Sequence, residues 1–162
     1  MRTYTSSQIA DFFRARANPE YGDLLSNLKL QKLCYYAAGI AAAVRKDRNA
    51  PLFDARIEAW QHGPVVPAQY ARFRHLGAGT IPHADDFDMS QIDPKDRELL
   101  DNVYDFYGQY SAWKLRNMTH DESPWIDAFA RADKTISTAE LEQFFASEVS
   151  QEYIESYHEA AA

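Results

Sequence analysis

The hydrophobic pattern of the chain is strongest over residues 26–44. Apolar residues recur there at helical spacing, at Leu30, Leu33, Ala37 and Val44. Beyond Leu33 the segment is apolar on nearly every side, which is typical of a helix that other elements surround. The pattern therefore predicts a central apolar helix over about residues 26–46. Gln31 and Lys32, the polar residues nearest its apolar part, are expected to emerge at its end rather than inside it.

Capping residues and prolines divide the rest of the chain into shorter helices. Helix starts are predicted at Ser6 or Ser7, Pro67, Asp93-Pro94, Ser111 or Ala112, Ser123-Pro124, and Ser137 with the capping-box residue Glu140. The apolar stripes of these helices run through Ile9–Phe13, through Tyr70 and Phe73 as far as Gly77, through Leu99, Val103, Phe106 and Tyr110, and through Val149, Tyr153 and Tyr157. Phe106 and Leu33 are expected in the core. With one short extended segment over residues 53–59, the prediction is a mainly α, compact single-domain helical bundle with at most a minor strand element.

Length and composition fit one soluble domain. The 162 residues are 46% hydrophobic and 14% aromatic, enough for a core that buries roughly 70% of the surface of the unfolded chain. The longest apolar run is shorter than the ~18 residues of a membrane helix, and the N-terminus lacks the apolar region of a signal peptide. The single cysteine, Cys34, excludes an internal disulfide and is expected to be a buried, inert thiol. We expect a cytoplasmic protein.

The formal net charge of −7 lies mainly at the C-terminus. Residues 135–162 contain six glutamates and neither lysine nor arginine, whereas the remainder carries nearly equal numbers of acidic and basic residues. The charge of the whole chain therefore overstates the case against a nucleic-acid partner. Such an acidic stretch is expected to be a solvated helix face, with an interaction element as the alternative.

Patterns for several catalytic and metal sites are incomplete. None of the five histidines has a ligand partner four residues further on. A calcium loop beginning at Asp86 would need glycine at position 91 and glutamate at position 97, where the chain has Gln91 and Arg97. The glycines at 77 and 79 follow a helix, which favours a helix C-cap over a phosphate-binding loop. No metal or cofactor is expected.

The stretch AWQHGPVVPAQY, residues 59–70, reads as a structural joint. Gly63 permits a turn, Pro64 and Pro67 favour helix initiation, and His62 is expected to satisfy the joint or to meet a partner. His120 stands beside another helix that begins with proline. The two histidines could form a metal or acid–base pair, but no carboxylate or cysteine accompanies them at a useful spacing. An enzyme is therefore not expected.

Three ordered motifs resemble the Panacea domain, a family that includes the SocA-type antitoxins and the phage-associated GepA-like proteins. They are LKLQKLCYYA (28–37), AWQHGPVVPAQY (59–70) and SAWKLRNMTHDESPW (111–125). The resemblance covers roughly residues 5–146, so we expect a Panacea-like antitoxin domain over 1–146 and an acidic helix or tail over 147–162. It implies a helical domain that neutralises a toxin encoded by a neighbouring gene by binding that toxin directly. SocA-type members act as adaptors that present their toxin to the ClpXP protease.

The candidate residues form two sets, and all of them except His62 and Trp113 lie at positions of the family pattern. Ten are expected to be structural: Leu30, Gln31, Leu33, Tyr35, Gly63, Pro64, Val65, Leu115, Thr119 and Pro124. We expect contact with a partner from eight others, most of them aromatic residues of the kind that dominate interfaces: Lys32, Tyr36, Trp60, His62, Tyr70, Trp113, His120 and Trp125.

Other functions stay open at this point. One is a nucleic-acid-binding autoregulator that uses a local basic patch of Lys29, Lys32, Arg45, Lys46 and Arg48. Against it, the DNA-binding helix-turn-helix domain of some family members has no room in this chain. Another is a small enzyme that uses His62 and His120. The final residues YHEAAA also resemble the tags that ClpX-type unfoldases grip, although an ordinary frayed helix end is the favoured interpretation.

Overall fold

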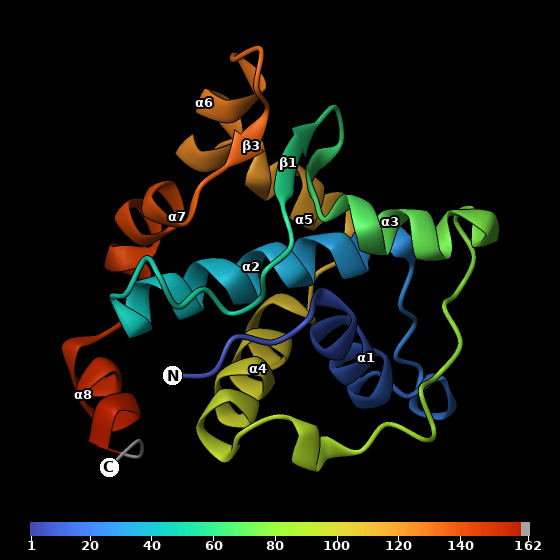
Figure 1. Cartoon of the computed structure of the whole chain (residues 1–162). Helices are drawn as coiled ribbons and strands as arrows, with labels where there is room; N and C mark the ends of the chain where they lie inside the picture. The colour runs from blue at the N-terminus through green and yellow to red at the C-terminus, as the bar shows by residue number, and fades with distance from the viewer. Residues whose placement is uncertain (160–162) are drawn as a thin grey trace.

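The computed structural model describes residues 1–159 and shows a helical domain built around one helix, α2 (Figure 1). The proposed protease tag at Ala161 and Ala162 lies outside the described residues. The α-helices are α1 (Ser6–Arg16), α2 (Asn27–Arg45), α3 (Pro67–Phe73), α4 (Pro94–Tyr107), α5 (Ala112–Thr119), α6 (Ser123–Phe129), α7 (Thr138–Phe145) and α8 (Gln151–Glu159). The 3-10 helices are η1 (Pro19–Tyr21), η2 (Arg74–Leu76), η3 (Met89–Gln91) and η4 (Ala146–Glu148).

Helix α2 occupies the centre, as its apolar pattern predicts. The Ser26 hydroxyl caps it by accepting a hydrogen bond from the backbone N–H of Lys29, and the helix ends at Lys46 in the left-handed conformation, with φ 54°. Helices α1, α4, α5, α7 and α8 all pack against it. Figure 1 shows α2 crossing the middle of the domain, with α1 and α4 on one side and α5, α6 and α7 on the other.

The strands of the described residues form one small antiparallel sheet in the order β2-β1-β3. Strand β1 (Ile57–Trp60) pairs with β2 (Gly63–Val65) and with β3 (Thr135–Ile136). The expected extended segment therefore exists, displaced toward Trp60. Gly63 makes the hairpin turn at φ 106°, a conformation that favours glycine.

The interpretation of Pro64 as a helix-initiating residue is wrong. Pro64 lies within β2 and pairs with Ala59, whereas Pro67 does begin α3. A proline lacks a backbone N–H, and β2 is an edge strand where one side of the ladder needs no donor. The joint is thus a β-hairpin followed at once by a helix.

Most predicted helix starts are confirmed. Ser111 caps α5, Ser137 and Glu140 form a capping box on α7, and prolines stand in the first turn of α4 and α6. Helix α1 differs from the prediction because Thr5, rather than Ser6 or Ser7, caps it through a capping box with Gln8.

The core differs from the prediction at three positions. Gln31 and Lys32 do not emerge at a helix end; they are 1% and 0% exposed inside the domain. Phe106 is 53% exposed, although its helical spacing predicts a core position. The buried stripe of α4 runs through Leu99, Val103 and Tyr107, which leaves Phe106 one residue, about 100°, away from it.

A buried ion pair anchors the C-terminal helix to the core. The Arg45 guanidinium contacts Asp96 at 3.1 Å, and neither side chain is exposed. The hydroxyls of Tyr4 and Tyr157 each donate to Asp96 at 2.7 Å, and Arg45 Nε donates to the Tyr157 hydroxyl at 3.0 Å. This network joins the ends of α2 and α8, the start of α4 and the N-terminal segment.

Among residues 1–159, no helix has the length and apolar character needed to cross a membrane.

Candidate partner-binding surface

Six of the eight residues expected to meet a partner gather on one surface, which we call the hairpin surface. It is formed by the β1–β2 hairpin together with the adjoining parts of α3, α5 and α6, which lie beside the hairpin in Figure 1. Its residues are Trp60, His62, Tyr70, Trp113, His120 and Trp125.

Aromatic contacts hold this surface together. The Trp60 ring meets the Tyr70 ring edge-on with centroids 4.9 Å apart, so the hairpin packs on α3. The indole N–H of Trp125 donates to the backbone carbonyl of Trp60 at 2.8 Å, and its ring stacks on Phe129 at 4.7 Å. Trp113 lies 55% exposed, with the guanidinium of Arg116 4.6 Å from its ring.

The His120 side chain makes the polar contacts between α5 and the β1–β2 hairpin. Its Nδ1 lies 2.7 Å from the carbonyl oxygen of Arg116 and its Nε2 lies 2.9 Å from that of Gln61. The imidazole therefore connects the end of α5 to the hairpin turn, and its ring packs against Trp125 with centroids 3.9 Å apart. His62 does not satisfy the joint: it is exposed and its ring lies 5.9 Å from that of Trp113. Of the two roles expected for His62, only the meeting with a partner remains.

Two buried polar side chains of α2 support the hairpin from below. The carbonyl oxygen of the Gln31 side chain accepts from the backbone N–H of Val66 at 2.9 Å. The Lys32 ammonium donates to the backbone carbonyl of Pro64 at 2.9 Å. Burial, with a smaller contribution from the charge of Arg116, lowers the pKa of Lys32 to about 7. These bonds satisfy the Pro64 carbonyl of edge strand β2 and the N–H of Val66, the residue between β2 and α3.

A half-buried carboxylate, Glu122, joins α2 to the start of α6. The hydroxyls of Tyr35 and Tyr36 donate to the two oxygens of Glu122 at 3.0 and 2.9 Å. Burial raises the pKa of Glu122 to about 7, although both hydroxyl bonds act to lower it. Sequence reasoning gave Glu122 no role; its only signal was its place inside the third motif.

The prediction that Lys32 and Tyr36 contact a partner does not fit this structure, because both side chains are fully buried. They lie under the hairpin surface and position it. The cause is the same for both: each bonds to a group far along the chain, Pro64 or Glu122, that the local pattern does not reveal.

The three sequence motifs meet at one point beneath this surface. All ten residues expected to be structural are buried. A Cβ atom at Gly63 would stand 2.7 Å from Cε of Lys32 and 2.7 Å from the hydroxyl oxygen of Thr119. These residues come from the second, first and third motif respectively. The motifs therefore build one platform, with the hairpin surface on its outer side.

The basic patch of the nucleic-acid hypothesis does not form. Arg45 and Lys32 are buried, Lys29 donates to the carbonyl of Gly108 at 2.6 Å, and Arg48 pairs with Glu142 at 3.3 Å. Lys29 and Lys32 lie near the start of α2, and Arg45, Lys46 and Arg48 lie at or beyond its end, so the five residues do not form one patch.

Within residues 1–159, no three side chains of His, Cys, Asp or Glu gather closely enough to hold a metal ion. Cys34 is buried, and burial raises the pKa of its thiol to about 12. At neutral pH the thiol stays protonated and is a poor nucleophile.

Comparison with known proteins agrees with the motifs. The model of the family described as "Antitoxin SocA-like, Panacea domain" matches residues 30–126. One curated relative is Antitoxin SocA of Caulobacter vibrioides (strain NA1000 / CB15N), which is 30% identical over 112 residues. That match covers 62% of this chain and 58% of the relative, so the chain spans little more than half of the relative's length. No solved structure matches.

Proposed function

This chain belongs to the SocA-like Panacea family, and we propose that it is an antitoxin that neutralises a toxin protein by binding it through the hairpin surface. The role is that of a non-enzymatic binder. The observation that carries the assignment of the surface is the exposure of Trp113 and Tyr70, 55% and 37%, above a platform built from all three family motifs.

The chemistry of the hairpin surface supports binding to protein. Tryptophan and tyrosine bury a large area at a small cost in side-chain entropy, and they predominate among residues that dominate binding energies. Trp113 and Tyr70 leave apolar area in water, while Trp60 and Trp125 are held by neighbouring rings and a backbone bond. A surface held in one geometry before binding loses less entropy when a partner docks.

We further propose that the chain delivers the bound toxin to the ClpXP protease. The support is the resemblance to SocA-type antitoxins. Delivery requires contact with two proteins at once, so the hairpin surface would hold the toxin and another part of the domain would face the protease.

The test is co-expression with the product of the adjacent gene, with growth and toxin level measured in cells with and without ClpXP. Trp113→Ala and Tyr70→Ala are made singly, with Tyr21→Ala as the matched control, since Tyr21 is 82% exposed on η1, outside the hairpin surface. If either aromatic anchors the toxin, its loss weakens the purified complex by about 2 kcal/mol, roughly thirtyfold in Kd.

The outcomes of these experiments distinguish delivery of the toxin to ClpXP from simple occlusion of the toxin, and they test the hairpin surface as the contact. Rescue that needs ClpXP, with the toxin disappearing only when this protein is present, supports delivery; rescue without the protease and with co-purification supports occlusion. If Trp113→Ala and Tyr70→Ala bind the toxin as tightly as Tyr21→Ala, the hairpin surface is not the contact. If the purified chains never associate while growth is still rescued, direct binding is refuted.

A further inference from the structure

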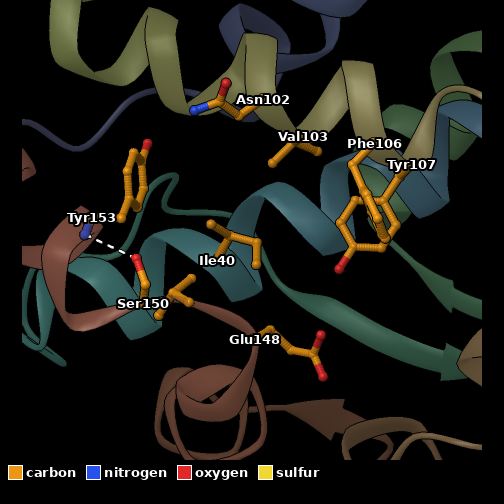
Figure 2. A pocket seen from close by; sticks show the side chains of 9 residues that line it. Ile40, Asn102, Val103, Phe106, Tyr107, Glu148, Ser150 and Tyr153 are labelled. Carbon is orange, nitrogen blue, oxygen red and sulfur yellow. Dashed lines mark hydrogen bonds between the residues drawn. The ribbon is translucent and has the colours of Figure 1, made fainter.

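A groove separate from the hairpin surface lies between α4 and the segment formed by η4 and α8. It has a volume of about 410 Å³ and its lining comes from α2, α4, η4, α8 and the short link before α8. Figure 2 shows Ile40 of α2 at its floor, Phe106 and Tyr107 of α4 at one end, and Tyr153 of α8 at the other. None of the residues of the hairpin surface lines it.

The walls of the groove are apolar and open. Ile40, Val103 and Val149 give it aliphatic surface, and Tyr107 closes its inner end by stacking on Tyr36 with ring centroids 3.8 Å apart. Phe106 is 53% exposed at the rim. An exposed phenylalanine beside an apolar hollow leaves area in water that a partner side chain can cover.

The charge of the groove is acidic. Glu148 lines it, and the lining contains neither lysine nor arginine. Figure 2 shows the carboxylate of Glu148 facing the end where Phe106 and Tyr107 lie. Glu98 and Glu152 are exposed on α4 and α8, one turn before the lining residue Asn102 and directly before Tyr153.

The negative potential extends behind the groove wall. The charge of Glu148 helps to raise the pKa of Tyr107 and of Glu122, in each case after the larger effect of burial. A cation bound beside Glu148 would be attracted by this carboxylate more strongly than in open water, because the site is partly shielded from solvent. The helices α4 and α8 flank the apolar floor in the manner of grooves that accept an amphipathic helix.

We propose that this groove binds a basic amphipathic helix of a partner protein, with apolar side chains on the floor between Phe106 and Tyr153 and a lysine or arginine beside Glu148. It is a second docking surface, so the chain can hold one protein at the hairpin surface and another here. The inference does not depend on which protein the hairpin surface binds.

The probe is a short acetylated and amidated helical peptide with leucines at helical spacing and arginines on their flanks. Its twin carries glutamate in place of every arginine. Binding to the full chain is followed by NMR chemical-shift titration. We expect the arginine peptide to bind with a Kd below about 1 mM and to shift the signals of Phe106, Tyr107 and Tyr153, with binding that weakens as salt is added. The glutamate twin is expected not to saturate.

Two pairs of variants locate the site. Glu148→Gln is expected to weaken binding about fivefold, whereas Glu155→Gln on the same acidic segment, outside the lining, leaves it unchanged. Phe106→Ala is expected to weaken it about tenfold, whereas Phe129→Ala beside the hairpin surface does not. Equal binding of the glutamate twin, shifts confined to other parts of the domain, or no saturable binding of the arginine peptide would each overturn the proposal. Loss of toxin binding in Trp113→Ala alone bears on the hairpin surface and not on this groove.

Discussion

Replacing Lys32 by methionine tests whether a buried lysine supports the hairpin at a cost to stability. Lys32 has no exposed surface, and its ammonium donates to the carbonyl of Pro64. No carboxylate forms an ion pair with it among the described residues. Burial therefore favours the neutral amine, and the pKa falls from 10.5 in the unfolded chain to about 7 in the fold.

The pH dependence of stability follows from these two values. Between pH 7 and 10.5 the unfolded chain keeps the proton on Lys32 and the folded chain has lost it, so unfolding takes up a proton and stability rises with pH. The stability is therefore lost as pH falls from 10.5 toward 7, and the loss levels off below pH 7. The full span is about 5 kcal/mol, and the part between pH 7 and pH 9 is about 2 kcal/mol.

Methionine at position 32 removes the titration and leaves the Pro64 carbonyl without its donor. The lost bond costs about 1–3 kcal/mol. At pH 7 wild-type Lys32 carries a burial cost of about 4 kcal/mol, so Lys32→Met is expected to be the more stable protein there. Near pH 10 the cost has nearly vanished, and wild type is expected to be equal or more stable.

Urea unfolding of both proteins, followed by far-ultraviolet circular dichroism at pH 7 and pH 9, measures the difference directly. Other titrating groups cancel because they are common to the two proteins. Lys114→Met on exposed α5 is the control and should change stability by less than about 0.5 kcal/mol at either pH. A difference between wild type and Lys32→Met that stays constant from pH 7 to pH 9 would refute the reasoning, because it would mean that the ammonium reaches water.

Three further changes probe other parts of the platform and core. The pKa of Glu122 is raised from 4.5 in the unfolded chain to about 7 in the fold, so between pH 4.5 and 7 the folded chain binds more protons than the unfolded chain. The free energy of unfolding therefore falls as pH rises from 4.5 to 7. In Glu122→Gln this part of the pH dependence should disappear from thermal unfolding curves. Asp96→Ala strands the buried charge of Arg45 and should cost about 3–5 kcal/mol in urea unfolding; a loss below 1 kcal/mol contradicts the network. Gly63→Ala should cost at least about 3 kcal/mol of stability, since backbone strain adds to overpacking against Lys32 and Thr119. Gly22→Ala, with φ 82° and open space around it, should cost only about 1 kcal/mol of strain. Equal losses would contradict the tight packing around Gly63.

Elements that depend on local chemistry could be predicted from the sequence. The all-round apolar character of residues 33–44 predicted the central helix, and Ser26, Ser111 and Ser137 cap the helices that they were expected to start. These signals act within four residues of the chain, so a single sequence contains them in full.

Polar side chains with distant partners could not be predicted. Gln31 and Lys32 were expected outside the core because burial of an unbonded polar group is costly. Their partners, Val66 and Pro64, lie more than 30 residues away and are backbone groups, which carry no sequence signature. Pro64 was misread for the same reason: its place in an edge strand depends on the pairing with Ala59.

The position of these polar groups connects the core to the hairpin surface. Strand β2 is three residues long, lies at a sheet edge and contains a proline, so its own ladder holds it weakly. Gln31 and Lys32 add two hydrogen bonds from the most buried helix of the domain, and His120 adds another at the turn. The hairpin surface thus takes its geometry from α2 and α5 rather than from its own strands. Buried residues, Lys32 above all, thus set the geometry of the exposed hairpin surface.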